Sequence, residues 1–478
     1  MATPVSFHLY FTDPSAVCEI FSRRQDFVRP IIEYKILEIF GPSLTTAGWD
    51  DWSRHRKPLA APFNESVMKF VWSETLRQSQ AMAASWSGHA ARQNGIVSTA
   101  KDVRTFSLNV LAAIGFGKSY DFDGSSDGPV AGKLSNYRDA LATVLDNSIV
   151  LMLVPLPWLK SSWAPRAWVK IGAAADSFME YMKRMVADEQ AALEKGKSGT
   201  GAGVMTSFVH ALHEHEAYEK SKDPSLPDIP KYRRGLSLDE VYSNLFIINF
   251  AGHDTTANTI TFALFCLAAY PDVQEWVAEE IAAVVGGTPI EDWDYKTLFP
   301  KLNRCRSILY ESLRLFPPIM VLPKWTAAKS QHITVAGKSI SIPPGISTNV
   351  YIRGIHTLPE YWDDPLAWKP RRWIVDSKHS ILGDEKFFEP SAGTYFPWSS
   401  GPQNCPGKKF AEAEAVALIA YLLNGRRITV KRRHGESKEA ACRRAYVCTQ
   451  KVNADLLLRM EDSGDTKLEY YKVGEEEG

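Results

Sequence analysis

One cysteine and the residues around it restrict this chain more than any other feature. The segment FPWSSGPQNCPG, at residues 396–407, is rich in turn-forming residues and continues directly into the helix-forming run KKFAEAEAVALIAYLL. We therefore expect Cys405 at the N-terminus of a helix over residues 406–423. Unpaired N–H groups and the helix dipole at such a position favour a thiolate over a thiol. The alternative is an inert cysteine buried at the start of a helix.

Three neighbours of Cys405 favour a functional thiolate. Gly401 permits a tight reversal of the chain, and Gly407 lets the backbone approach a bound group closely. Trp398 is large enough to pack against the sulfur and shield it from water, which would tune the redox potential of a bound metal. A thiolate in this setting is what a haem iron requires of an electron-donating axial ligand.

Composition and charge limit the other functions. The 478 residues include 55 Lys and Arg against 55 Asp and Glu, so the charge gives no reason to expect a nucleic-acid partner. No signal peptide is recognisable, and no uninterrupted apolar run reaches the roughly 20 residues of a membrane span. The cysteines form no CxxC pair, which excludes zinc-ribbon and thioredoxin-like sites, and their scatter favours a reducing compartment. They are Cys18, Cys266, Cys305, Cys405, Cys442 and Cys448.

Helical patterns dominate the chain, and short strands gather at its N-terminus and after residue 317. We predict a mainly α fold with a minor β part, in a single domain over residues 1–478. The expected strands are Val5–Phe11, His332–Val335, Ser339–Ile342 and Thr348–Ile352. The expected helices include one that starts at Asp13-Pro14, two within residues 76–117 and one that ends at Pro317-Pro318. The expected loops are residues 195–203 and 218–234.

A long apolar helix over residues 236–270 is interrupted by polar residues. Ser237 and Glu240 form a capping-box sequence at its start. Further on, the segment AGHDTT places a glycine and two threonines in a buried apolar pattern, where they are locally unfavourable. Ala251 and Thr255 lie on one face, so a hydroxyl that competes for the Ala251 carbonyl would open a polar notch able to hold oxygen and a water. The alternative is simple back-bonding of the threonine beside a surface aspartate.

One further pair of residues shares a helix face. Glu311 and Arg314, in YESLRLFPP, lie three residues apart. By itself this pair is equally consistent with a surface ion pair, which contributes little to stability.

These segments together resemble the cytochrome P450 superfamily of haem-thiolate monooxygenases, in particular its fungal microsomal members. Trp398, Gly401, Cys405 and Gly407 match the family's cysteine loop in order and spacing. The loop departs from the family pattern by Trp398 in place of phenylalanine and by Gln403 in place of a basic residue that helps to hold a haem propionate. The resemblance covers almost the whole chain and implies the family's prism-shaped fold.

The resemblance also implies roles for the other motifs. Asp254 would feed protons, and Thr255 would stabilise the activated oxygen at the iron. Arg372, in WKPRRW, would join Glu311 and Arg314 in a buried triad.

Three residues would hold the haem propionates by the same resemblance. Trp52 and Arg56 would hold one propionate, and Lys324 is a candidate for the other. The expected wall of the substrate pocket is Ile247, Phe250, Ala251, Val321 and Leu322.

The implied activity is insertion of one oxygen atom from O2 into a lipophilic small molecule, as a tailoring step in terpenoid or polyketide metabolism. It implies haem b, an NADPH-dependent flavoprotein reductase whose docking Lys408 and Lys409 would steer, a monomer, and the surface of the endoplasmic reticulum. The alternatives are an inactive haem-binding relic and an oxygen-independent peroxide isomerase or dehydratase. Members of this last class usually lack the pair formed here by Asp254 and Thr255.

The N-terminus is short beside those microsomal members. We expect no membrane anchor and no first strand, so the strand Val5–Phe11 should present an unpaired edge. The apolar stretch Ile149–Leu159 is expected in a loop above the substrate entrance, as one remaining weak membrane contact.

Overall fold

The structure is a computed structural model that describes residues 7–60, 64–96, 99–117, 119–122, 137–196, 203–222, 228–375, 382, 384–454, 456–461, 464 and 466–475. The chain divides into two compact units. Unit 1 comprises Met1–Arg29, Met68–Leu108 and His253–Gly478, and unit 2 comprises Pro30–Val67 and Asn109–Gly252. Three of the four boundaries fall inside helices, and the fourth, after Arg29, lies between a strand and a helix. A single domain over residues 1–478 stays a prediction.

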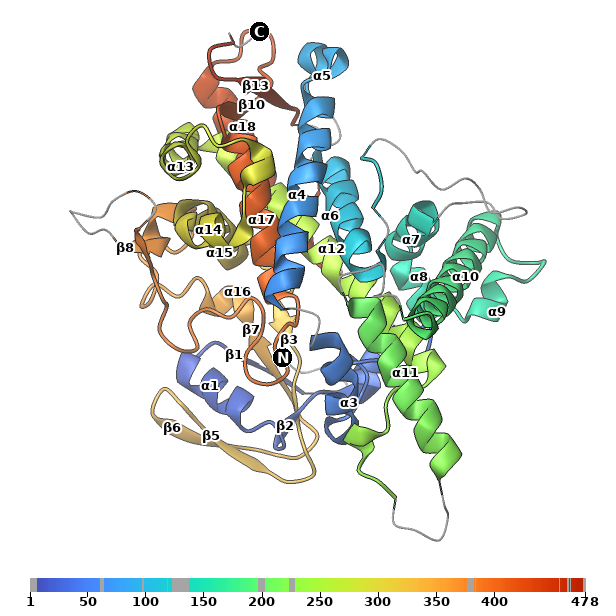
Figure 1. Cartoon of the computed structure of the whole chain (residues 1–478). Coiled ribbons are helices and arrows are strands. Elements are labelled where there is room, and N and C mark those ends of the chain that lie inside the picture. Colours follow the sequence, from blue (N-terminus) through green and yellow to red (C-terminus); the bar gives the residue numbers. More distant parts are fainter. Residues whose placement is uncertain are drawn as a thin grey trace. The chain divides into compact units, whose positions relative to one another are not determined.

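Unit 1 is built around the helix that follows the cysteine loop. This helix, α17 (Lys408–Leu423), is rich in alanine and almost wholly buried, and it packs against α13 (Pro271–Val285) and α15 (Asn303–Leu315) (Figure 1). Small side chains let neighbouring helices approach closely, so α17 can be covered on several sides. The remaining helices of this unit include α1 (Pro14–Ser22), α5 (His89–Asn94), α14 (Tyr295–Leu298), α16 (Ile352–Ile355) and α18 (Lys438–Gln450). Three helices belong in part to each unit: α4 (Glu65–Trp86), α6 (Thr99–Phe116) and α12 (Leu238–Ala269).

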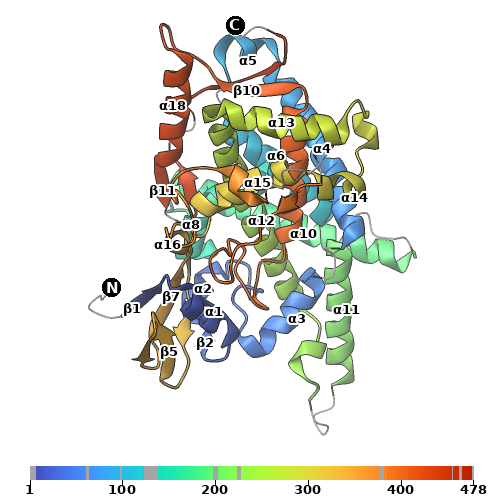
Figure 2. The same cartoon turned by 90° about the vertical axis from the view of Figure 1, so that its left-hand side faces the viewer.

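The largest sheet lies in unit 1, beside α1 (Figure 2). Its strand order is β1 (His8–Phe11), β7 (Ser347–Tyr351), β4 (Trp325–Thr326) and β2 (Phe27–Val28), and β3 (Val321–Leu322) also pairs with β7. β1 is parallel to β7 and has no other partner among the described strands, which agrees with the predicted edge. Val5, where the strand was expected to start, lies outside the described residues.

The other strands of unit 1 pair in twos. β5 (Gln331–Val335) and β6 (Lys338–Ile342) contain two of the predicted strands and pair as a hairpin, which turns at Ala336 and Gly337, both with positive φ. The other pairs are β8 (Ile374–Val375) with β9 (Lys386–Phe387), β10 (Arg426–Val430) with β13 (Leu468–Lys472), and β11 (Val452–Ala454) with β12 (Leu458–Met460). Asp13 caps α1 as predicted, because its carboxylate accepts a hydrogen bond from the Ala16 N–H at 2.9 Å.

Two helical segments differ from the sequence predictions. α11 (Val204–Ser221) continues four residues into the segment expected to be a loop from Tyr218 onwards. Tyr218 is buried, and its hydroxyl donates to Asp228 at 2.5 Å, so a tertiary contact holds this last turn. The prediction also missed α18, which Ser437 caps by accepting from the Ala440 N–H at 3.2 Å. Most of the other predicted loop, residues 197–202, lies outside the described residues.

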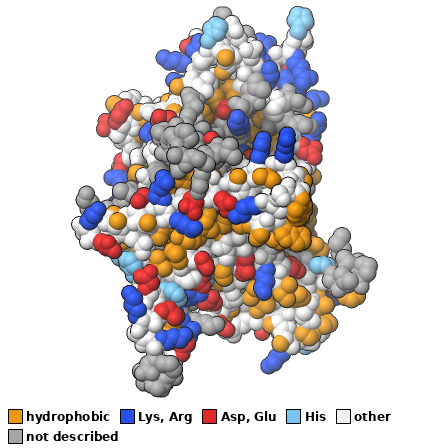
Figure 3. Space-filling model, turned by 90° about the vertical axis from the view of Figure 1, so that its right-hand side faces the viewer, with side chains coloured by type: hydrophobic (Ala, Val, Ile, Leu, Met, Phe, Trp, Pro, Cys, Tyr) orange, Lys and Arg blue, Asp and Glu red, His pale blue; other side chains and the backbone are white. Residues whose placement is uncertain are grey.

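Unit 2 is helical. α10 (Arg166–Glu194) packs against α7 (Tyr137–Asp146), α9 (Leu156–Leu159) and α11, and α3 (Trp49–Ala60) also packs against α11. The stretch Ile149–Leu159, expected as a loop, forms two short helices, α8 (Ser148–Leu153) and α9. The side chains of Leu153, Trp158 and Trp163 are exposed in and beside these two helices. Figure 3 shows hydrophobic side chains, in orange, on the face of the molecule that carries α7 to α10. No helix in the described part of the chain combines the length and the apolar character that crossing a bilayer requires.

Candidate active site

The cysteine loop closes on itself through backbone hydrogen bonds. The Cys405 N–H donates to the Trp398 carbonyl at 2.8 Å, and the Asn404 N–H donates to the Gly401 carbonyl at 3.1 Å. Gly401 has a φ of 71°, a conformation that a side chain would strain, so the expected reversal occurs at this residue. Gly407 is the N-cap of α17, two residues after Cys405. The loop therefore presents Cys405 just ahead of the first turn of a buried helix.

Cys405 differs from the other cysteines in its exposure. It is exposed, whereas the other five are buried or half-buried. Burial raises the pKa of the Cys266 and Cys305 thiols well above the usual value, so those thiols are poor sources of a thiolate. A Cβ at Gly407 would lie 3.8 Å from the Cys405 sulfur, so a side chain there would start to cover it. Among these cysteines, Cys405 is the one that a large planar group can reach.

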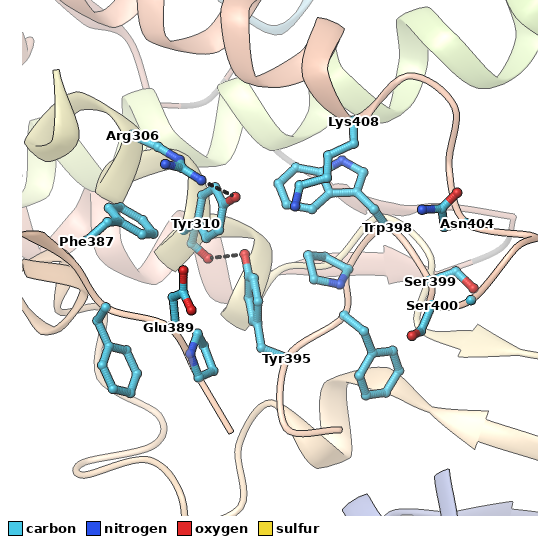
Figure 4. A pocket seen from close by; sticks show the side chains of 15 residues that line it. Arg306, Tyr310, Phe387, Glu389, Tyr395, Trp398, Ser399, Ser400, Asn404 and Lys408 are labelled. Carbon is cyan, nitrogen blue, oxygen red and sulfur yellow. Dashed lines mark hydrogen bonds between the residues drawn. The ribbon is translucent and has the colours of Figure 1, made fainter. Parts of the chain in front are cut away.

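A pocket of about 420 Å³ lies beside the cysteine loop (Figure 4). Six of the 15 residues that line it are aromatic. The Trp398 and Tyr310 rings pack edge to face at 5.3 Å, and the Lys408 ammonium stands 5.3 Å from the centre of the Trp398 ring. The Tyr395 hydroxyl donates to the Tyr310 carbonyl at 3.0 Å (Figure 4). Trp398 thus holds the loop with its carbonyl and anchors it with its ring.

Lys324 and Gln403 lie together in unit 1. The Lys324 ammonium donates to the Gln403 amide oxygen at 3.2 Å, and Lys324 is buried, with 9% of its surface exposed. Burial, and then the nearby Arg29, lower the pKa of Lys324 to about 8. The position where the family carries a basic side chain is therefore occupied by a neutral amide bonded to a buried cation. An ammonium with one amide partner retains donors for a carboxylate, so this pair fits a haem propionate.

The polar segment within α12 contains a buried acid beside residues that remain accessible. Asp254 is buried, at 5% exposure, so the alternative of a surface aspartate does not hold. Thr255 is half-buried and Ala251, one turn earlier, is exposed, whereas most residues of this helix are buried. The helix therefore keeps an accessible strip next to a buried acid.

Asp254 is held by ion pairs that the sequence did not reveal. Arg104, from α6, lies 3.1 Å from one carboxylate oxygen, and Arg459, from β12, donates to the other. His253 places its Nε2 atom 3.6 Å from the first oxygen. Arg459 lies 205 residues after Asp254 along the chain, and Arg104 lies well over 100 residues before it. No local sequence pattern marks either arginine as a partner of this acid.

The structure brings Glu311, Arg314 and Arg372 together. Arg314 donates to both carboxylate oxygens of Glu311, at 2.9 and 2.8 Å, and both side chains are fully buried. Arg372 lies 3.2 Å from one of these oxygens. The Trp373 indole N–H and the Lys369 backbone N–H, at 2.9 and 2.8 Å, complete five hydrogen bonds to one carboxylate. The pair is therefore not the surface ion pair that remained an alternative.

His356 connects this triad to the cysteine loop. Arg314 donates to the His356 carbonyl at 2.9 Å, and the His356 ring nitrogen Nε2 accepts from the Phe396 N–H at 3.0 Å. Burial, and then the charge of Arg314, lower the pKa of His356 to about 3, so the ring remains a neutral acceptor. The sequence analysis missed this residue, because a lone histidine carries no motif.

Trp52 and Arg56 lie on α3 in unit 2. The Arg56 guanidinium stands 6.0 Å from the Trp52 ring centre, and Trp49 stacks on Trp52 at 5.6 Å. Their predicted role toward a propionate stays a prediction. Of the expected pocket wall, Ile247 is buried, and Phe250 stacks on Phe246 at 5.7 Å.

The middle of α3 is fixed to the start of α12 within unit 2. Arg54 donates to Asp51 at 2.8 and 2.9 Å and to Glu240 at 2.6 Å, while the buried His55 ring lies 3.6 Å from each carboxylate. Burial lowers the pKa of His55, but hydrogen bonding to these two carboxylates outweighs it, so the pKa is raised. Glu240 also accepts from the Ser237 N–H at 2.8 Å, which confirms the predicted capping box.

Comparison with known proteins agrees with these features. The family model for cytochrome P450 matches residues 8–452. A cytochrome P450 monooxygenase of Arthrobotrys oligospora is 28% identical over 98% of this chain and 83% of its own length. Cytochrome P450 monooxygenase 124 of Postia placenta is 31% identical over 88% of this chain and 75% of its own length. The phomenoic acid biosynthesis cluster cytochrome P450 monooxygenase of Leptosphaeria maculans is 26% identical over 97% of this chain and 81% of its own length.

A solved structure, the heme domain of cytochrome P450DA, superposes with a TM-score of 0.72 at 19% identity and covers 99% of this chain and 89% of that chain. This likeness confirms the predicted mainly α fold with a minor β part. The chain belongs to the cytochrome P450 family and is a monooxygenase. The family implies a haem-thiolate iron cofactor, O2 and a redox-partner reductase.

Proposed function

We propose that Cys405 supplies the thiolate that would hold a haem b iron, and that the enzyme inserts one atom of O2 into a lipophilic small molecule. The observation that carries this proposal is the exposed Cys405 thiol, held by a closed loop at the start of α17 while the other cysteines are shielded. The relative from the phomenoic acid biosynthesis cluster favours a tailoring step in secondary metabolism, and we propose a terpenoid or polyketide scaffold as its substrate.

The described residues fit a haem. Lys324 would hold one propionate by a charge-assisted hydrogen bond, with Gln403 orienting the ammonium. Trp52 and Arg56 would hold the other. When bound, the haem iron supplies the activation of O2. Asp254 would hold a proton and pass it toward Thr255, whose hydroxyl would relay it into the site.

We propose further that electrons come from an NADPH-dependent flavoprotein reductase, that Lys408 and Lys409 at the start of α17 steer its docking, and that the enzyme is a monomer. We place it at the surface of the endoplasmic reticulum. The exposed hydrophobic side chains Leu153 and Trp158, of α8 and α9, would support weak contact with a lipid surface.

The test is the carbon monoxide difference spectrum of the reduced protein. The parent protein and Cys448→Ser should both give the red-shifted Soret band of a thiolate-ligated haem, whereas Cys405→Ser should lose it. Retention of this band by Cys405→Ser would overturn the assignment.

The same samples separate the alternative functions. An inactive relic would give no thiolate band or would fail to oxidise NADPH when its reductase is supplied. A peroxide isomerase would keep the band and would convert an organic hydroperoxide without NADPH or O2.

A further inference from the structure

The acid on α12 is enclosed by two arginines from distant parts of unit 1. Arg459 donates a hydrogen bond to one carboxylate oxygen of Asp254, while Arg104 lies 3.1 Å from the other, which accepts no hydrogen bond from the described residues. The Asp254 side chain is 7% exposed, whereas those of Arg104 and Arg459 are 30% and 38% exposed. The two guanidiniums therefore lie between a buried acid and the solvent.

This cluster differs from the structural triad of the same unit. In the triad, one guanidinium grips both oxygens of Glu311 and both side chains are fully buried. Around Asp254, the two guanidiniums approach different oxygens, and each is part-exposed. A two-point grip by one arginine is rigid, whereas contacts from two separate elements depend on the position of each element. The contacts around Asp254 are therefore suited to orienting its carboxylate, whereas those around Glu311 are suited to holding the fold together.

Arg459 is carried by a small hairpin. Its strand, β12, pairs only with β11 among the described strands, and Arg459 lies opposite Asn453. The hairpin is attached to the rest of unit 1 by the Leu458 N–H, which donates to the Pro318 carbonyl at 2.9 Å. A second attachment is the contact between Met460 of β12 and Cys448 of α18, whose sulfurs lie 3.5 Å apart. The position of Arg459 is thus set by α18 and by the segment that follows α15, both outside α12.

One hydrogen-bond donor of the Arg459 guanidinium is unused. Its Nε atom is buried and has no hydrogen-bond acceptor among the described residues. An unsatisfied buried donor is costly, which indicates that this side chain is placed for its contact with Asp254 and not for its own stability. Arg459 also lies beyond residue 452, where the match to the family model ends.

We propose that Arg459 is the positioning residue for Asp254. Together with Arg104, it restricts the rotamer of the carboxylate, so that Asp254 delivers its proton toward Thr255 and in no other direction. An aspartate has two rotatable side-chain bonds, and a hydrogen bond to one oxygen with a guanidinium beside the other restricts both rotations. The proposal rests on the proposed role of Asp254 in proton transfer.

The experiment uses the holoenzyme with its reductase and NADPH, and without substrate, so that no substrate need be known. Oxygen that receives two electrons and two protons leaves as hydrogen peroxide and consumes one NADPH. Oxygen that receives four electrons and four protons leaves as two waters and consumes two NADPH. Ordered proton delivery favours water, so the ratio of NADPH to O2 consumed reports it. An oxygen electrode and a peroxide assay measure both quantities.

We expect Arg459→Gln to lower this ratio toward one and to raise peroxide several-fold. Arg459→Lys should restore most of the parent ratio, and Arg443→Gln, at an exposed arginine of α18, should leave it unchanged. Asp254→Asn should lower the ratio as well. Combined with it, Arg459→Gln should add nothing, because the two residues act as one unit.

The unfolding midpoints of the same variants give a readout that does not depend on turnover. The shifts caused by Asp254→Asn and Arg459→Gln should be non-additive. Additive shifts, or an unchanged ratio in Arg459→Gln, would overturn the proposal. A variant Asp254→Asn with the parent ratio and a normal thiolate spectrum would instead refute the role of Asp254 itself.

Discussion

Replacing Glu311 by glutamine tests whether the buried triad holds unit 1 together. The glutamine side chain has nearly the same shape, so no cavity forms, but it cancels the charge that five donors share. One oxygen becomes an NH2 group, which faces N–H donors and cannot accept from them. Arg314, which is fully buried, would then retain a charge without its counter-ion.

The expected loss follows from the burial. Breaking a buried ion pair by removing one partner costs about 3–5 kcal/mol. The 478 residues, at about 2.1 cal/mol/K each near the midpoint, give an unfolding entropy of about 1 kcal/mol/K. The melting temperature of Glu311→Gln should therefore fall by about 3–5 °C in thermal unfolding followed by circular dichroism.

The matched control is Glu275→Gln. Glu275 pairs with Arg427 through two contacts, at 2.7 and 2.5 Å, but its side chain is 61% exposed. An exposed pair contributes about 1 kcal/mol or less, so this variant should melt within about 1 °C of the parent. Equal shifts in Glu311→Gln and Glu275→Gln would refute the reasoning, because burial would then have no bearing on the cost of losing the pair.

Three further predictions follow from charged groups of unit 1. Burial raises the pKa of Glu414 to about 8, so the folded state holds a proton that the unfolded chain releases above about pH 4.5. The stability from this group is therefore full below that pH and is lost as the pH rises through about 8, and Glu414→Gln should flatten this part of the profile of unfolding midpoint against pH. Because the pKa of Lys324 is lowered to about 8, haem retention after gel filtration should decline above about pH 8 in the parent but not in Lys324→Arg; identical profiles would exclude this lysine as an anchor. Reversal of charge at Lys408 and Lys409 should slow reduction by the reductase far more at low than at high salt, and a salt-independent effect in stopped-flow spectroscopy would exclude steering.

The cysteine loop and its helix could be predicted from local sequence. Turn formers followed by an alanine-rich run fix where the loop ends and α17 begins, because each choice depends on residues close along the chain. The capping box at Ser237 and the hairpin at Gly337 were predictable for the same reason. Spacing also identified Glu311 and Arg314 as neighbours, since a helix places residues three apart on one face.

Burial and long-range pairing could not be predicted in this way. The sequence left open whether Glu311 and Arg314 lay at the surface, and five donors from α15 and the segment after Ala367 settle this in the folded chain. The last turn of α11, placed in a loop by its composition, is helical because Tyr218 is buried and reaches Asp228.

The sequence by itself determined the family, the fold class and the position of the cysteine, because each is written in motifs or periodicity over short stretches. Only the tertiary structure decided what surrounds those residues. Arg459 reaches Asp254 from a hairpin far along the chain, and Lys324 meets Gln403 across 79 residues. Such pairs form when packing brings separate elements together, and long-range contacts of single charged side chains leave no periodic trace in a sequence.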